Sequence, residues 1–228
     1  GTTLVLVTHD ERLAHRCRRL IRLEAGLMVA AIVIGVGLNW VWGKKVAITD
    51  MPQMVAIYNG MGGGAAALIA AVEFTSAEPP TGVHAVLAMM GAFIGSVAFS
   101  GSVLAWAKLQ GVMKKAFRLP AQNAVNVVLA LITLGLGVAI VIAPAIDPML
   151  VGAFFVLALV LGAVITLPIG GADMPVVISL LNAFTGLAVG FKGFVIGNPA
   201  LIVAGIVVGA SGKNMTIAHF GLKCWTVP

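Results

Sequence analysis

Long apolar stretches separated by short polar segments make up the sequence from residue 26 onward. Six of them have roughly the ~20 residues that an α-helix needs to cross a bilayer, and Gly, Pro, Asp or Lys marks each boundary. A seventh, residues 199–212, is too short for a full crossing. The pattern predicts an all-α fold, a polytopic transmembrane helical bundle with six full spans and a partial seventh. The full stretches are residues 26–43, 51–74, 82–106, 123–143, 148–167 and 174–197.

The first 25 residues have a different pattern. Residues 2–7 predict a short buried strand, residues 11–20 an amphipathic helix, and residues 21–26 a second short strand. The apolar run precedes the charges and is too short for a signal peptide. We expect residues 1–25 to be an appended, soluble-type fragment without a stable domain of its own, because it buries too little surface to offset chain entropy.

The composition restricts the class of protein. Of 228 residues, 60% are hydrophobic and 10% are charged, and the mean hydropathy is +1.08. A soluble domain typically carries about 25% charged residues, and a fold of this size lacks the interior to hide so much apolar surface. A soluble enzyme, a disordered chain and a secreted disulfide scaffold are therefore excluded. Cys17 and Cys224 match no metal or redox spacing, and we expect no metal site.

The charges between the stretches predict the topology. Loops after the first and third stretches are basic, whereas those after the second and fourth contain acidic residues and no Lys or Arg. By the positive-inside rule the basic loops are cytoplasmic, and by parity so are the 170–173 loop and the C-terminus. The net charge of +6 thus reflects membrane topology rather than nucleic-acid binding. The loop charges are Lys44, Lys45, Lys108, Lys114, Lys115 and Arg118, against Glu73, Glu78 and Asp147.

The tripeptide Asp-Met-Pro opens two of the stretches, at residues 50–52 and 173–175. An Asn and a Gly recur at matching distances after each copy, as Asn59 and Gly63, and as Asn182 and Gly186. Four crossings separate the copies, so both stretches should start on the same side of the membrane. The repeat fits duplicated helix starts, which are common in transporters. It also fits convergent capping, because Asp favours the N-cap and Pro the first turn.

Five polar residues occur within the apolar stretches, where a bilayer makes them costly. An imidazole can gain and lose a proton near neutral pH, so His84 fits either a proton path or an interfacial histidine bonded to a carbonyl. Asn182 fits either an ion path or an interhelical hydrogen bond. We expect Lys192 to extend its ammonium toward the far face. The five are Asn59, His84, Asn126, Asn182 and Lys192.

His84 and Asn182 should both face the bundle interior, because lipid offers neither a hydrogen-bond partner. The stretch that contains His84 starts on the non-cytoplasmic side, and the stretch that contains Asn182 starts on the cytoplasmic side. Asn182 lies about 13 Å into its stretch, at ~1.5 Å per residue, so we expect the two residues at different depths in the membrane. Closely spaced glycines fit tight helix contacts. No strand precedes them, so they are not a dinucleotide-binding turn. These glycines are Gly62, Gly63, Gly64, Gly91, Gly95, Gly205 and Gly209.

Residues 26–212 resemble the membrane domain of the beta subunit of proton-translocating NAD(P) transhydrogenase. Long runs agree in register, above all Gly170-Gly-Ala-Asp-Met-Pro-Val-Val-Ile-Ser-Leu-Leu-Asn182. The other segments are Lys44-Lys-Val46, Asp50-Met-Pro-Gln-Met-Val-Ala56, Phe99-Ser-Gly-Ser-Val103 and residues 198–212.

The resemblance implies a membrane domain that conducts protons inward while the complete enzyme transfers hydride from NADH to NADP⁺. It implies that His84 and Asn182 belong to the proton pathway, and that Asp173 lies in a cytoplasmic loop that communicates with the NADP domain. No catalytic or cofactor-binding residue is expected in this chain; NADP(H) and NAD(H) bind elsewhere in the complete enzyme. The implied partners are the lipid bilayer, an alpha subunit and a second beta subunit, in a bacterial inner membrane.

Both ends of the chain depart from this resemblance. Residues 213–228 match nothing in the family, and the nucleotide domain that follows in the family is not in this sequence. Residues 1–25 resemble the tail of an ABC-transporter ATPase through Leu4-Val-Leu-Val-Thr-His-Asp10, but no phosphate-cradling loop accompanies them. Two alternative functions therefore stand beside the proton conductor: a structural membrane anchor and an ABC-transporter-related component.

Overall fold

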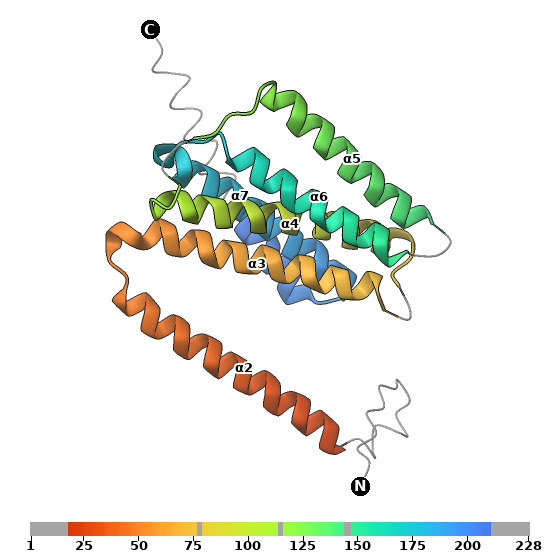
Figure 1. The fold of residues 1–228 in the computed structure, drawn as a ribbon. Helices are drawn as coiled ribbons and strands as arrows, with labels where there is room; N and C mark the ends of the chain where they lie inside the picture. Colours follow the sequence, from red (N-terminus) through yellow and green to blue (C-terminus); the bar gives the residue numbers. More distant parts are fainter. Residues whose placement is uncertain (1–17, 77–78, 114–115, 144–146, 211–228) are drawn as a thin grey trace. The chain divides into compact units, whose positions relative to one another are not determined.

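A computed structural model describes residues 18–76, 79–113, 116–143 and 147–210. The chain divides into two compact units, Gly1–Ile48 and Thr49–Pro228, and each is described by itself. Every regular element of the described residues is helical (Figure 1), as the all-α prediction requires. Five helical segments are long and apolar enough to cross a membrane: Ile48–Phe74, Gly82–Leu109, Gln122–Ile142, Pro148–Thr166 and Gly171–Val195.

The first unit contains one long helix, α2, Arg18–Lys45. It includes the expected stretch 26–43 but is not among the five spanning candidates. The strand expected at residues 21–26 is wrong, because the Arg-Leu-Glu-Ala run there consists of good helix formers and continues α2 without a Pro to stop it. The strand expected at residues 2–7 lies outside the described residues.

The described residues of the second unit form six helices. Hydropathy predicted their positions to within about three residues at either end, since a spanning segment must satisfy its backbone internally as a helix. Short 3₁₀ turns, Ile48–Asp50 (η1) and Gly171–Asp173 (η2), lead into α3 and α7. The helices are α3, Met51–Phe74; α4, Gly82–Leu109; α5, Gln122–Ile142; α6, Pro148–Thr166; α7, Met174–Val195; and a shorter one, Pro199–Ala210.

The two Asp-Met-Pro copies start α3 and α7 with the same backbone conformation. Asp50 has φ −99° and ψ 1°, Asp173 has φ −91° and ψ −2°, and each is followed by a Pro in the first turn. Neither aspartate caps its helix through a side-chain hydrogen bond. Convergent capping therefore does not fully explain the repeat, because both aspartates occupy the N-cap position but neither forms the capping hydrogen bond.

Helices α3 and α7 run parallel, as the repeat predicts. Early in both helices, Ala56 lies in one apolar cluster with Met174 and Ile178. Further along both, Glu73 forms an ion pair with Lys192. Both Asp-Met-Pro starts therefore lie at the same end of the bundle.

The central helix of this unit is α4, which packs against α3, α5, α6 and α7 (Figure 1). Small residues make this possible. A Cβ on Gly95 would lie 2.6 Å from the Gly63 carbonyl oxygen, so α3 and α4 cross with their backbones in contact. A Cβ on Gly162 of α6 would lie 2.4 Å from the Val97 carbonyl oxygen of α4. Close approach of this kind is how helices associate in lipid, where apolar burial alone gives no driving force.

The short helix Pro199–Ala210 rests on α7 through a second set of glycines. A Cβ on Gly205 would lie 2.5 Å from the Cα of Gly190, and one on Gly193 would lie 2.7 Å from the Ile202 nitrogen. This contact confirms the small-residue interpretation of the glycine pairs. The exposed surface of the unit is apolar, and most of α5 is exposed, as suits a lipid-facing helix.

Candidate functional site

Buried polar groups follow α3 where it meets α4 and α7. Asn59 on α3 is 5% exposed. Its Nδ2 donates to the Ser102 hydroxyl oxygen of α4 at 2.8 Å. The Thr185 hydroxyl of α7 donates to the Asn59 carbonyl oxygen at 3.4 Å. One amide side chain and its backbone thus join three helices in the interior of the unit.

Several buried acceptors along these helices have no hydrogen-bond partner among the described residues. One is the Asn59 side-chain oxygen, and others are Gln53 Oε1 and the Tyr58 hydroxyl, nearer the start of α3. On α4 the Ser96 hydroxyl likewise has no hydrogen-bond partner among the described residues. Buried polar atoms usually have partners, so each of these oxygen atoms can still form a hydrogen bond with water or another proton-carrying group.

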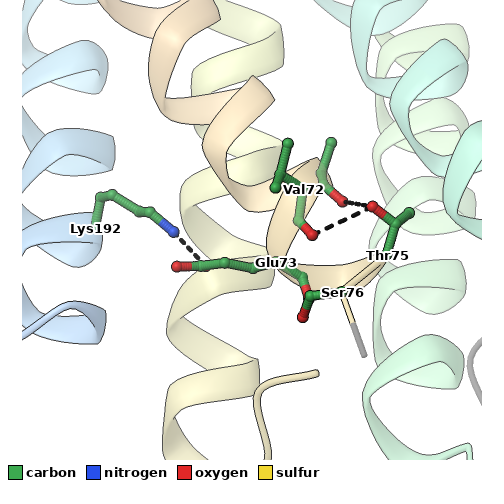
Figure 2. A network of polar contacts seen from close by, with 6 residues as sticks. Val72, Glu73, Thr75, Ser76 and Lys192 are labelled. Carbon is green, nitrogen blue, oxygen red and sulfur yellow. Dashed lines mark hydrogen bonds and ion pairs between the residues drawn. The ribbon is translucent and has the colours of Figure 1, made fainter. Parts of the chain in front are cut away.

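An ion pair links the last turns of α3 and α7. The Lys192 Nζ contacts the Glu73 carboxylate (Figure 2), and the side chains are 4% and 24% exposed. The expectation that Lys192 extends its ammonium to the far face is therefore wrong. The ammonium instead forms an ion pair with a carboxylate inside the unit. Glu73 is therefore a charge of α3, which ends at Phe74, and not of the loop that follows.

The hydroxyls that follow Glu73 are directed to the backbone. The Thr75 hydroxyl donates to the carbonyl oxygens of Ala71 at 2.9 Å and Val72 at 3.2 Å. The Ser76 hydroxyl donates to the Glu73 carbonyl oxygen at 2.8 Å (Figure 2). The Ala71 and Glu73 carbonyls also accept from the backbone nitrogens of Thr75 and Ser76, so the hydroxyls add a second donor to each at the end of α3, while the Glu73 carboxylate faces Lys192.

His84 is the third residue of α4 and is exposed. Its ring centroid lies 6.1 Å from that of Phe194, with the planes tilted by 33°. We expected an interior-facing His84, and for the described residues this is wrong, because the first turn of α4 is not enclosed by its neighbours. The contact does place His84 at the level of Phe194, two residues beyond Lys192.

Asn182 is half-buried on α7, one turn before Thr185. It precedes Phe194 by twelve residues, or about 18 Å along a helix, so His84 and Asn182 lie at staggered depths, as expected. Asp173 is exposed at the end of η2. The structure therefore does not bring His84, Asn182 and Asp173 together. They are distributed along the length of the bundle.

A second buried lysine lies at the other end of α4. Lys108 is 7% exposed, and its Nζ donates to the carbonyl oxygens of Thr166 at 2.8 Å, Leu167 at 2.5 Å and Ile169 at 2.7 Å. We counted it as a loop charge after a span that ends at residue 106. Instead α4 continues to Leu109, because these carbonyls provide the lysine with acceptors inside the protein.

Sequence reasoning missed the roles of Ser102, Thr185, Glu73 and Lys108. The sequence gives no signal for Ser102 and Thr185, because hydroxyl residues are common in membrane helices. A usable signal exists for Glu73 and Lys108, because each lies within one turn of the end of an apolar stretch and can still belong to the helix.

Comparison with known proteins adds the following. A family model described as NAD(P) transhydrogenase beta subunit matches residues 2–219. Two Rhodospirillum rubrum sequences, both named NAD(P) transhydrogenase subunit beta, are each 40% identical over 198 residues, covering 83% of this chain and 42% of the relative. The chain thus spans about two fifths of the length of these relatives. The family match extends beyond residues 26–212 at both ends and takes in most of the first 25 residues.

Proposed function

Because the chain belongs to the NAD(P) transhydrogenase beta subunit family, we propose that its helical bundle is the proton-conducting membrane domain of such an enzyme. In the complete enzyme, this domain would couple inward proton movement to hydride transfer from NADH to NADP⁺. The observation that supports this most is the row of buried polar groups along α3, α4 and α7. Ionisable and amide side chains are costly in a membrane interior and commonly mark ion or proton paths.

We assign His84 and Asn182 to this path and Asp173 to the coupling loop. An imidazole suits the role because one nitrogen can accept a proton while the other donates one. At the opposite end, Asp173 precedes α7 directly, so a force on its loop would act on the helix that carries Asn182 and Lys192. The proton would pass from the His84 end toward the Asp173 end.

The described residues do not fit a bound nicotinamide nucleotide. A pyrophosphate is held by a glycine-rich turn between a strand and a helix, and the described residues contain only helices. Gly63 serves a helix contact instead, since a Cβ there would lie 2.9 Å from the Gly95 carbonyl oxygen. Three carboxylate, imidazole or thiol groups that could hold a metal do not come together in the described part of the chain.

The remaining proposals concern the setting of the domain. Residues 26–212 form the transmembrane proton-translocating part, with six full spans if α2 also crosses. The protein would lie in a bacterial inner membrane with its C-terminus in the cytoplasm. An alpha subunit, a second beta subunit and the lipid bilayer would be its partners, with nucleotides bound outside the described helices.

The test uses the complete enzyme, with its nucleotide domains and alpha subunit, reconstituted in lipid vesicles. His84→Ala should abolish proton movement measured with a pH-sensitive dye, while hydride transfer between nucleotides is followed separately. The matched control is Val83→Ala, the preceding exposed residue in the same turn. Normal pumping by His84→Ala would remove His84 from the path. If the unsubstituted enzyme moves no protons at all, the bundle is a structural anchor.

A further inference from the structure

We propose that the Glu73–Lys192 ion pair is a proton-accepting station on this path, with Glu73 as the group that takes up and releases the proton. The inference rests on the proposed function and adds a residue pair to it. Lys192 acts as a positioning residue, because its ammonium holds the Glu73 carboxylate between α3 and α7.

The location of the pair supports this role. His84 lies at the level of Phe194, and Lys192 lies on the same turn of α7. Glu73 is about one-quarter exposed whereas Lys192 is buried, so the carboxylate can be reached from outside the unit while it contacts the buried ammonium. Among the described residues, the titratable groups at this end of the bundle are Glu73, His84, Asp147 and Lys192. Asp147 is exposed and accepts a hydrogen bond from the Met149 nitrogen.

Charge balance gives the pair its sensitivity to protons. The two side chains together carry no net charge, which reduces the cost of burying them. A proton that leaves hydronium or an imidazolium forms an O–H bond with Glu73, and the donor's own bond to hydrogen breaks. The carboxylate charge is lost and the Lys192 charge is left alone among apolar groups, a costly state. The proton therefore moves on, or α7 moves to rehydrate Lys192.

Two features direct this effect into α7. Gly193, directly after Lys192, packs against the backbone of the Pro199–Ala210 helix, so a movement of the α7 backbone at Lys192 would also displace that helix. Helix α7 starts at Met174, directly after Asp173. Proton occupancy at one end of α7 would thus be transmitted toward the loop at the other end.

The experiment compares Glu73→Gln, Lys192→Met and the double variant in the complete enzyme in vesicles. Each single variant leaves one charge unpaired and should lower assembly. In the double variant both charges are gone, so assembly should recover, yet protons moved per hydride transferred should remain about tenfold or more below the unsubstituted enzyme. Val72→Ala, the exposed neighbouring residue on α3, is the control and should pump normally.

A double variant that pumps at the normal ratio would show that the pair is only structural. If the double variant does not assemble, Glu73→Asp decides, because it keeps the carboxylate. It should retain the pumping ratio to within about threefold, with a shifted pH profile of pumping, and an inactive but assembled Glu73→Asp overturns the proposal. The controls separate this from the proposed function: if the enzyme and Val72→Ala pump no protons, the proposed function itself fails.

Discussion

Among the described residues of the bundle, two lysines are buried, and each lies in the last turn of its helix. Lys108 at the end of α4 is 7% exposed and Lys192 at the end of α7 is 4% exposed. Lys108 donates to three backbone carbonyls that end α6 and follow it. Lys192 contacts one carboxylate, that of Glu73. The same side chain in the same helical position thus meets neutral acceptors in one case and an opposite charge in the other.

The difference determines which contact can change. Carbonyl oxygens at a helix end carry partial negative charge that no physiological pH removes. The acceptors of Lys108 therefore do not titrate, and the contact ties α4 to the end of α6. A carboxylate loses its charge when it takes up a proton, so the Lys192 contact between α3 and α7 can respond to protons. Lys108 thus holds α4 and α6 together, whereas protonation of Glu73 can weaken the contact between α3 and α7.

The largest expected effect is on stability when the Lys108 contact is removed. Lys108→Met should lower the free energy of unfolding by about 4 kcal/mol, because it removes three charge-assisted hydrogen bonds and leaves buried carbonyls without donors. Reversible unfolding in mixed detergent micelles measures this. Lys45→Met, an exposed lysine at the end of α2, should change the same quantity little. A comparable loss in both variants would refute the buried contact.

The second effect is somewhat smaller and can be reversed by a partner substitution. Lys192→Met should cost about 3 kcal/mol, because an unpaired carboxylate remains partly buried. Adding Glu73→Gln should recover most of that cost. The same unfolding assay on the two single variants and the double variant gives the coupling energy. Additive losses would mean that the two side chains do not interact, and the contrast with Lys108 would disappear.

The smallest expected effect comes from removing an uncharged hydrogen bond, which serves as a reference for the two lysine contacts. Ser102→Ala should lower the free energy of unfolding by about 1 kcal/mol, since it removes one uncharged hydrogen bond and leaves the Asn59 Nδ2 without its acceptor. The neighbouring exposed residue gives the control, Val103→Ala. A loss as large as that of Lys108→Met would mean that charge is not what distinguishes the lysine contacts.

The helices of the second unit could be predicted from sequence because lipid allows little other backbone structure. The stretch 51–74 coincides with α3, and the stretch 148–167 ends one residue beyond α6. The main departure, the extension of α4 to Leu109, has a physical cause. Hydropathy counts Lys108 as a loop charge, and it cannot foresee that carbonyls of another helix accept its ammonium.

The site was predictable only in part. Asn59 and Asn182 stand out because an amide is unusual in an apolar stretch. Their partners do not, since Ser102 and Thr185 are common residues in membrane helices, and their roles depend on how each helix is rotated about its axis. The same holds for Glu73 and Lys192, whose contact depends on the parallel packing of two helices far apart in the sequence. The exposure of His84 likewise follows from helix ends, which hydropathy does not resolve.

The contact between α7 and the Pro199–Ala210 helix has a mechanical consequence. Where Gly205 meets Gly190, backbone lies against backbone, and a Cβ would be only 2.5 Å from the opposing Cα. Side chains that separate most helices can change rotamer and absorb small movements, but here none intervenes. We therefore expect the two helices to move as one rigid body, so that a displacement of α7 also displaces the short helix.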